Sequence, residues 1–243
     1  MNLEEEIKKL KEQVPDNPIP LSKMTTILAA TLDQAATNWA FKTYWDKRFL
    51  KLAQIDELEQ TEKDRIFNEL ILASLCLVIL TLEARDLRQE EAFKDYLLKV
   101  KDEITNVHTD QLKELGIERK HWRLWQKLIK MRYEEYEESR LTAREAMMEY
   151  EGKEKNLEIA DLTGINLTIP PFIVAVGAHK HIARGRIKGR DLLFKLIMKK
   201  LSRFYTEVRI IIEGGKISPT LRALMRLKHF WNDLIGKITF DRG

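Results

Sequence analysis

The residues best suited to chemistry lie in one short stretch, GAHKHIARGRIKGRD, which covers residues 177–191. It contains two histidines, five basic side chains and three glycines. Histidines can bind a metal ion, cations can bind phosphate, and glycines let backbone amides approach a phosphate closely. The stretch therefore indicates one of three things: a phosphate-binding loop, a metal site, or a solvated turn between two helices.

A metal site has the least support from the spacing of the possible ligands. On a helix, His179 and His181 lie about 200° apart and cannot share one ion, although on a strand they would point the same way. No cysteine and no nearby carboxylate before Asp191 completes a ligand set. Glu118 and His121 have the Glu-x-x-His spacing of di-iron bundles, but such sites need two of these pairs and we find one. We expect no metal and no other cofactor.

Arg222 and His229 form a second candidate site, because seven residues bring two side chains to nearly the same face of a helix. Their spacing resembles the Arg-x(4–6)-His motif of HEPN ribonucleases. In that family the pair lies at a dimer interface and cleaves RNA, so the resemblance implies catalytic roles for these two residues. The resemblance covers two positions, and Ala223 stands where the family commonly has a polar residue. The alternative is an ordinary histidine at the surface of a basic helix.

The charge of the chain is distributed unevenly. Residues 171–243 carry 16 Lys and Arg against 5 Asp and Glu, whereas the preceding 170 residues carry 26 against 33. The formal net charge of +4 hides this difference. Such a split predicts either a polyanionic partner for the basic part or docking of one part of the chain on the other.

The basic side chains of the last third gather on a helix and on the loop before it. We expect a helix from Asp191 to about Ile212 whose apolar face includes Leu193, Ile197 and Leu201. Cations on the opposite side and in the loop could neutralise phosphates, which gives nucleic acids affinity without sequence information. The alternative is a solvated surface, or one that faces the acidic part. The predicted nucleic-acid contacts are Arg184, Arg186, Lys188, Arg190, Lys195, Lys199 and Arg203.

The elements that must position these residues are predicted to be helices. Only ten glycines and six prolines interrupt 243 residues, so the chain reads as an all-α multi-helix bundle. We expect an acidic helical bundle over 1–155, a linker over 156–169 where helical periodicity breaks, and a basic three-helix part over 170–243. The acidic part includes one long helix, about 118–151, and the two parts can pack into one body. In the basic part FIVAV, residues 172–176, could instead form a short strand.

Two further features bear on the fold and on the compartment. A helix over about 23–53 carries Trp39, Phe41, Trp45 and Phe49, which we expect to pack in the core. The apolar run Leu70–Leu82 is shorter than a membrane span and indicates a buried helix. With one cysteine and no apparent targeting segment, we expect a cytoplasmic protein without a membrane partner.

The sequence leads to three functional hypotheses. The first is a non-enzymatic protein that binds RNA or DNA through the basic C-terminal face. The second is a helical scaffold that binds a protein partner or self-associates through the Glu118–Glu151 helix. The third is an RNA-cleaving enzyme that uses Arg222 and His229.

Overall fold

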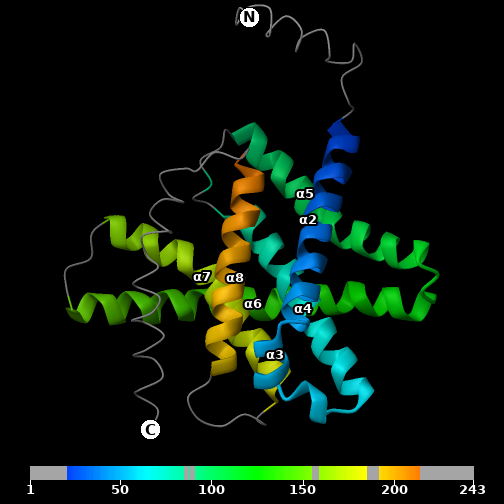
Figure 1. The fold of residues 1–243 in the computed structure, drawn as a ribbon. Coiled ribbons are helices and arrows are strands. Elements are labelled where there is room, and N and C mark those ends of the chain that lie inside the picture. The colour runs from blue at the N-terminus through cyan, green and yellow to red at the C-terminus, as the bar shows by residue number, and fades with distance from the viewer. Residues whose placement is uncertain (1–20, 85–86, 88–90, 155–158, 185–191, 214–243) are drawn as a thin grey trace, which may run out of the picture.

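The computed structural model describes residues 21–84, 87, 91–154, 159–184 and 192–213. Within these residues the chain forms seven α-helices, one short 3-10 helix and no strand, so the expected all-α multi-helix architecture is confirmed. In chain order the elements are α2 Leu21–Tyr44, α3 Lys47–Leu52, η1 Ile55–Glu57, α4 Gln60–Leu82, α5 Glu91–Glu114, α6 Arg119–Glu154, α7 Ile159–Ala183 and α8 Leu192–Ile212 (Figure 1).

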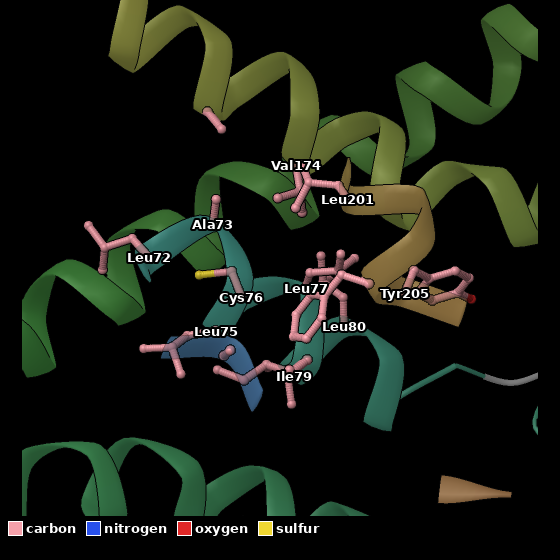
Figure 2. Packing of buried hydrophobic residues seen from close by; sticks show 14 of the residues in the cluster. Leu72, Ala73, Leu75, Cys76, Leu77, Ile79, Leu80, Val174, Leu201 and Tyr205 are labelled. Atoms are coloured by element: carbon pink, nitrogen blue, oxygen red, sulfur yellow. The ribbon is translucent and has the colours of Figure 1, made fainter. Parts of the chain in front are cut away.

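The helix α4 lies at the centre of the bundle. The helices α2, α5, α6, α7 and α8 all contact it, and every residue from Glu69 to Leu82 is buried. A helix that is apolar on all sides is stable only when other helices enclose it, because it has no polar side to expose to water. Figure 2 shows side chains of α4 with Val174 of α7 and Leu201 of α8 close by. The predicted buried helix over Leu70–Leu82 is therefore confirmed.

Two helical segments, Gln60–Leu82 and Leu162–Ala183, are long and apolar enough to cross a membrane. Most of each apolar window is buried inside the protein, 83% in the first and 67% in the second. A helix enclosed by other helices has the same composition as a membrane span. The bundle itself therefore accounts for both apolar segments.

The long helix α6 contacts α4, α5 and α7 along its length. Near its start Lys113 of α5 lies 4.4 Å from the ring centre of Trp122, across a turn at Gly116 with φ of 76°. Its second half runs beside the start of α7, where Thr168 lies 3.7 Å from the sulfur of the buried Met147 (Figure 1). The second half of the helix that we considered for self-association thus has α7 of the same chain beside it.

The helix α7 differs from the expectation at its start. Residues 159–169, part of the expected linker over 156–169, form its first turns, and Pro170 and Pro171 lie inside it. The FIVAV run, residues 172–176, is helical and not a strand. Burial explains the difference. Glycine, threonine and proline have low helix propensity, but the burial of apolar side chains around α7 stabilises the helix more than these residues weaken it. Gly177 permits the close approach of α6, since a Cβ there would lie 2.3 Å from Cε1 of Tyr136.

The helix expected over 23–53 is in fact two helices. It breaks after Tyr44, and Asp46 caps α3 by accepting hydrogen bonds from the backbone N–H groups of Arg48 (2.8 Å) and Phe49 (3.3 Å). The expectation that four aromatic residues pack in the core is half wrong. Trp39 and Phe49 pack inward, whereas Phe41 is 56% exposed and Trp45 is 60% exposed.

The described helices of the acidic and basic parts share one hydrophobic core. The buried cluster extends from Ala29 on α2 through α4, α5 and α6 to Ile212 on α8. Residues 1–20 of the expected acidic part and 214–243 of the expected basic part lie outside the described residues. The structure therefore shows α7 and α8 of the basic part docked on helices of the acidic part.

Candidate nucleic-acid interface

The stretch that began the sequence argument is the end of α7 and the connection to α8. The two histidines lie on different sides of the helix, as their spacing predicted. The ring of His179 packs edge-on against Phe194 of α8, with centres 5.8 Å apart. Nε2 of His181 lies 2.8 Å from a carboxylate oxygen of Glu135 on α6. The helix ends at Ala183, followed by Arg184 with a positive φ of 45°.

Acidic side chains of the N-terminal part neutralise the cations at this helix end. Arg184 lies 3.2 Å from Glu62, and Lys180 lies 3.7 Å from Glu135. Arg65 donates a hydrogen bond of 2.5 Å to the carbonyl oxygen of His181, which satisfies one of the free carbonyls at the end of α7. The end of α7 is thus held to α4 and α6 by charge as well as by packing.

A buried ion pair joins α4 to α6 beside this helix end. Nε and Nη2 of Arg132 donate to the two carboxylate oxygens of Glu69, at 3.0 and 2.7 Å. Arg132 is 9% exposed and Glu69 is 7% exposed. The hydrogen bonding of Arg132 to the Glu69 carboxylate is the main cause of the raised pKa of its guanidinium group. Nη1 of Arg132 also reaches Glu135 at 3.3 Å, so the pair continues to the carboxylate that contacts His181.

The orientation of α8 is set by α2 and by the cap of α3. The indole N–H of Trp39 donates to the carbonyl oxygen of Lys200 at 3.1 Å, and its ring stacks on Phe204 at 5.6 Å. The ammonium group of Lys200 lies 2.9 Å from Asp46. These contacts fix the rotation of α8 about its axis, and with it the direction of its polar side.

Three predicted contact residues lie on that polar side. Lys199 and Arg203 are exposed and Lys195 is half-buried, and none of them makes an ion pair within the described chain. The other described cations of this region, Lys180, Arg184, Lys200 and Arg209, all pair with carboxylates. The acidic part therefore neutralises some of the basic residues and leaves one stripe of α8 uncovered by acidic side chains among the residues described.

A second group of cations, which the sequence pattern did not indicate, lies on α3. Lys47, Arg48 and Lys51 are exposed and have no ion-pair partner among the described residues. The helix α3, which carries these cations, contacts α8, and the Asp46–Lys200 pair joins the two (Figure 1). We name the two groups together the α3–α8 basic surface. Its members are Lys47, Arg48, Lys51, Lys195, Lys199 and Arg203.

The Asp46–Lys200 pair gives a prediction about stability and pH. The hydrogen bond from Lys200 is the main cause of a lowered pKa at Asp46. A carboxyl group whose pKa is lower in the folded chain than in the unfolded chain stabilises the fold at pH values above its unfolded pKa. This contribution is lost as the pH falls below about 4, through the pKa of the group in the folded chain. At neutral pH, Asp46→Ala should cost about 1 to 2 kcal/mol through the lost helix cap. Asp46→Asn can still cap α3, so it should cost less.

Urea unfolding of these variants at neutral and acidic pH checks this prediction. The stability difference between the wild type and Asp46→Asn should shrink as the pH falls below about 4, since protonation removes the same charge. A difference that stays constant across this range would show that Lys200 does not stabilise the ionised carboxylate.

The remaining candidates from the sequence do not form a site in the part of the chain that is described. Glu118 pairs with Lys120 at 2.8 Å, and His121 is exposed. Among the described residues, no group of three His, Cys, Asp or Glu side chains could hold a metal ion. Outside the described residues lie Arg186, Lys188, Arg190, Arg222 and His229.

Comparison of the chain with protein-family models, with curated proteins and with solved structures gives no match.

Proposed function

We propose that the protein binds nucleic acid through the α3–α8 basic surface. The observation that carries this proposal is the set of unpaired cations on two adjoining helices, in a bundle that pairs its other described C-terminal cations with acids. Unpaired cations at close spacing repel one another, and a polyanion relieves that repulsion while it releases its own counterions.

The spacing on α8 suits a phosphate backbone. Lys195, Lys199 and Arg203 follow one another at intervals of four residues, so they extend over about 12 Å along one side of the helix. The carboxylate that caps α3, Asp46, contacts α8 and is neutralised there by Lys200. The exposed Glu207 comes one further turn along α8 and marks the end of the basic stripe.

A binding titration with labelled RNA and DNA tests the proposal. The wild type should bind at about 50 mM salt and lose affinity steeply toward about 200 mM. Replacing Lys195, Lys199 and Arg203 together with alanine should weaken binding about tenfold or more at the lower salt concentration. The matched control replaces Lys99, Lys127 and Arg144, which are exposed on α5 and α6 and unpaired within the described chain.

The control variant loses the same charge, so it should keep most of the affinity. Equal weakening of both variants would mean that net charge alone attracts the nucleic acid and that binding does not depend on the α3–α8 basic surface. No binding of the wild type at low salt would contradict the proposal itself.

Self-association through α6 is the second candidate. Three large apolar side chains are exposed on this helix: Leu124 at 51%, Met131 at 47% and Leu141 at 68%. A second copy that covered them would remove apolar surface from water. The molar mass in solution tests this candidate, because a monomer at high concentration would exclude it.

A further inference from the structure

Two aromatic side chains stand exposed beside the α3–α8 basic surface. Phe41 and Trp45 lie on the last turn of α2 and just after it, and their ring centres are 6.2 Å apart. They do not stand alone, because Phe41 contacts Phe67 at 6.3 Å and Trp45 contacts Tyr44 at 5.4 Å. Half-buried aromatic rings beneath them hold the two exposed rings in place. A contiguous apolar patch on a protein surface often marks a binding site.

Basic side chains flank this pair of rings. Lys42 is exposed on the same turn of α2 as Phe41, and it makes no ion pair within the described residues. Trp45 directly precedes Asp46, the residue that caps α3 and binds Lys200. The rings therefore lie next to the start of α3, at the α3 end of the basic surface.

We infer that the ligand of this surface is a single-stranded nucleic acid, whose bases stack on Trp45 and Phe41 while its phosphates follow α3 and α8. This inference rests on the proposed function. Stacking of a base on an aromatic side chain contributes about 1 to 3 kcal/mol and needs no particular base. In a duplex the bases stack on one another and pair, so the two rings would add little to duplex binding.

The surroundings of the rings favour a strand over a membrane surface, which exposed aromatic and basic residues could also bind. Asp56 and Asp64 lie near enough to Tyr44 to add to the rise in its pKa, which burial mainly causes. A single strand of nucleic acid is narrow, so it can lie along the cations on the side of the rings opposite these carboxylates. An anionic bilayer is a broad plane, and it would also meet the carboxylates beside Tyr44.

The inference is tested with the full-length chain, an oligo(dT) strand and a duplex of the same length. Phe41→Ala combined with Trp45→Ala should weaken binding of the strand about tenfold or more and leave duplex binding within about twofold. Leu115→Ala is the control, because it removes an apolar side chain that is 76% exposed at a distant turn. Circular dichroism verifies that the variants keep their helices.

Tryptophan fluorescence provides a direct readout of stacking. The chain has five tryptophans, and Trp45 is the one we expect the bases to contact. Addition of oligo(dT) should quench part of the emission of the wild type. The Trp45→Phe variant keeps an aromatic ring and should bind with similar affinity, but without this quenching.

The outcomes separate the inference from the proposed function. If the wild type binds strand and duplex alike and the double variant changes neither, the surface binds nucleic acid and the stacking inference is wrong. If the wild type binds no nucleic acid at low salt, both are wrong. If the wild type binds vesicles of anionic lipid but no oligonucleotide, and the double variant does not bind the vesicles, the rings bind a membrane surface instead.

Discussion

Replacing Arg132 with methionine is expected to lower the free energy of unfolding by about 3 to 5 kcal/mol. Arg132 donates two hydrogen bonds to Glu69, and both side chains are almost completely buried. Without the guanidinium group the Glu69 carboxylate would remain in the core without its cation, and burial of an unpaired charge costs several kcal/mol. Urea unfolding followed by circular dichroism measures the change. Domains have total stabilities of about 5 to 15 kcal/mol, so this single substitution threatens the fold.

Two further variants make this prediction specific. Arg140→Met removes the cation of a partly exposed pair on the same helix, where Arg140 lies 2.9 Å from Glu137, and should cost about 1 kcal/mol or less. Glu69→Met combined with Arg132→Met removes both charges and should be more stable than Arg132→Met alone. If Arg132→Met and Arg140→Met proved equally mild, the buried pair would not have the role that its geometry indicates.

Reversal of charge on both helices of the α3–α8 basic surface should remove nucleic-acid binding. We expect a loss of more than about a hundredfold at about 100 mM salt when Lys47, Arg48, Lys199 and Arg203 are all replaced with glutamate. Each replacement removes a phosphate contact and adds a repulsive charge. The four side chains are exposed and unpaired among the described residues, so the fold should tolerate the changes.

The two halves of this variant test whether α3 and α8 act together. Lys47→Glu with Arg48→Glu changes α3 alone, and Lys199→Glu with Arg203→Glu changes α8 alone. Each pair should weaken binding measured by fluorescence anisotropy. Loss of binding from the α8 pair, with none from the α3 pair, would restrict the interface to the residues that the sequence pointed to.

The helix α8 shows what the sequence could predict. Apolar residues recur along it with the helical period, and Leu193, Ile197 and Leu201 are buried as expected. Its bounds, Leu192–Ile212, match the predicted helix. A strong period over twenty residues leaves little choice of structure, so both the element and its buried side follow from the sequence.

The helices α2, α3 and α7 show where local patterns were insufficient. The break at Asp46 was signalled only by one residue with a good capping side chain, and it separates the exposed Trp45 from the buried Phe49. The start of α7 contains glycine, threonine and two prolines, which weaken a helical pattern. Its stability comes from neighbours distant in the chain, and periodicity in one segment does not reveal them.

For the candidate site, too, the sequence indicated some features and missed others. The sequence identified the cations Lys199 and Arg203, but not that Arg184 would meet Glu62, 122 residues earlier in the chain. It assigned Lys47 and Arg48 to an acidic part, because net charge was counted along the chain and not over a surface. Which cations are paired and which are open is a property of the tertiary fold.

The most direct test of the α3–α8 basic surface is the salt dependence of binding to a single strand. For each phosphate neutralised, the slope of log K against log salt steepens by about 0.7. We predict a steep negative slope for the wild type that becomes shallower by about 2 when Lys195, Lys199 and Arg203 are replaced with alanine. The variant with alanine at Lys99, Lys127 and Arg144 should keep the slope of the wild type. A slope that is the same in all three proteins, or no binding at about 50 mM salt, would contradict this account.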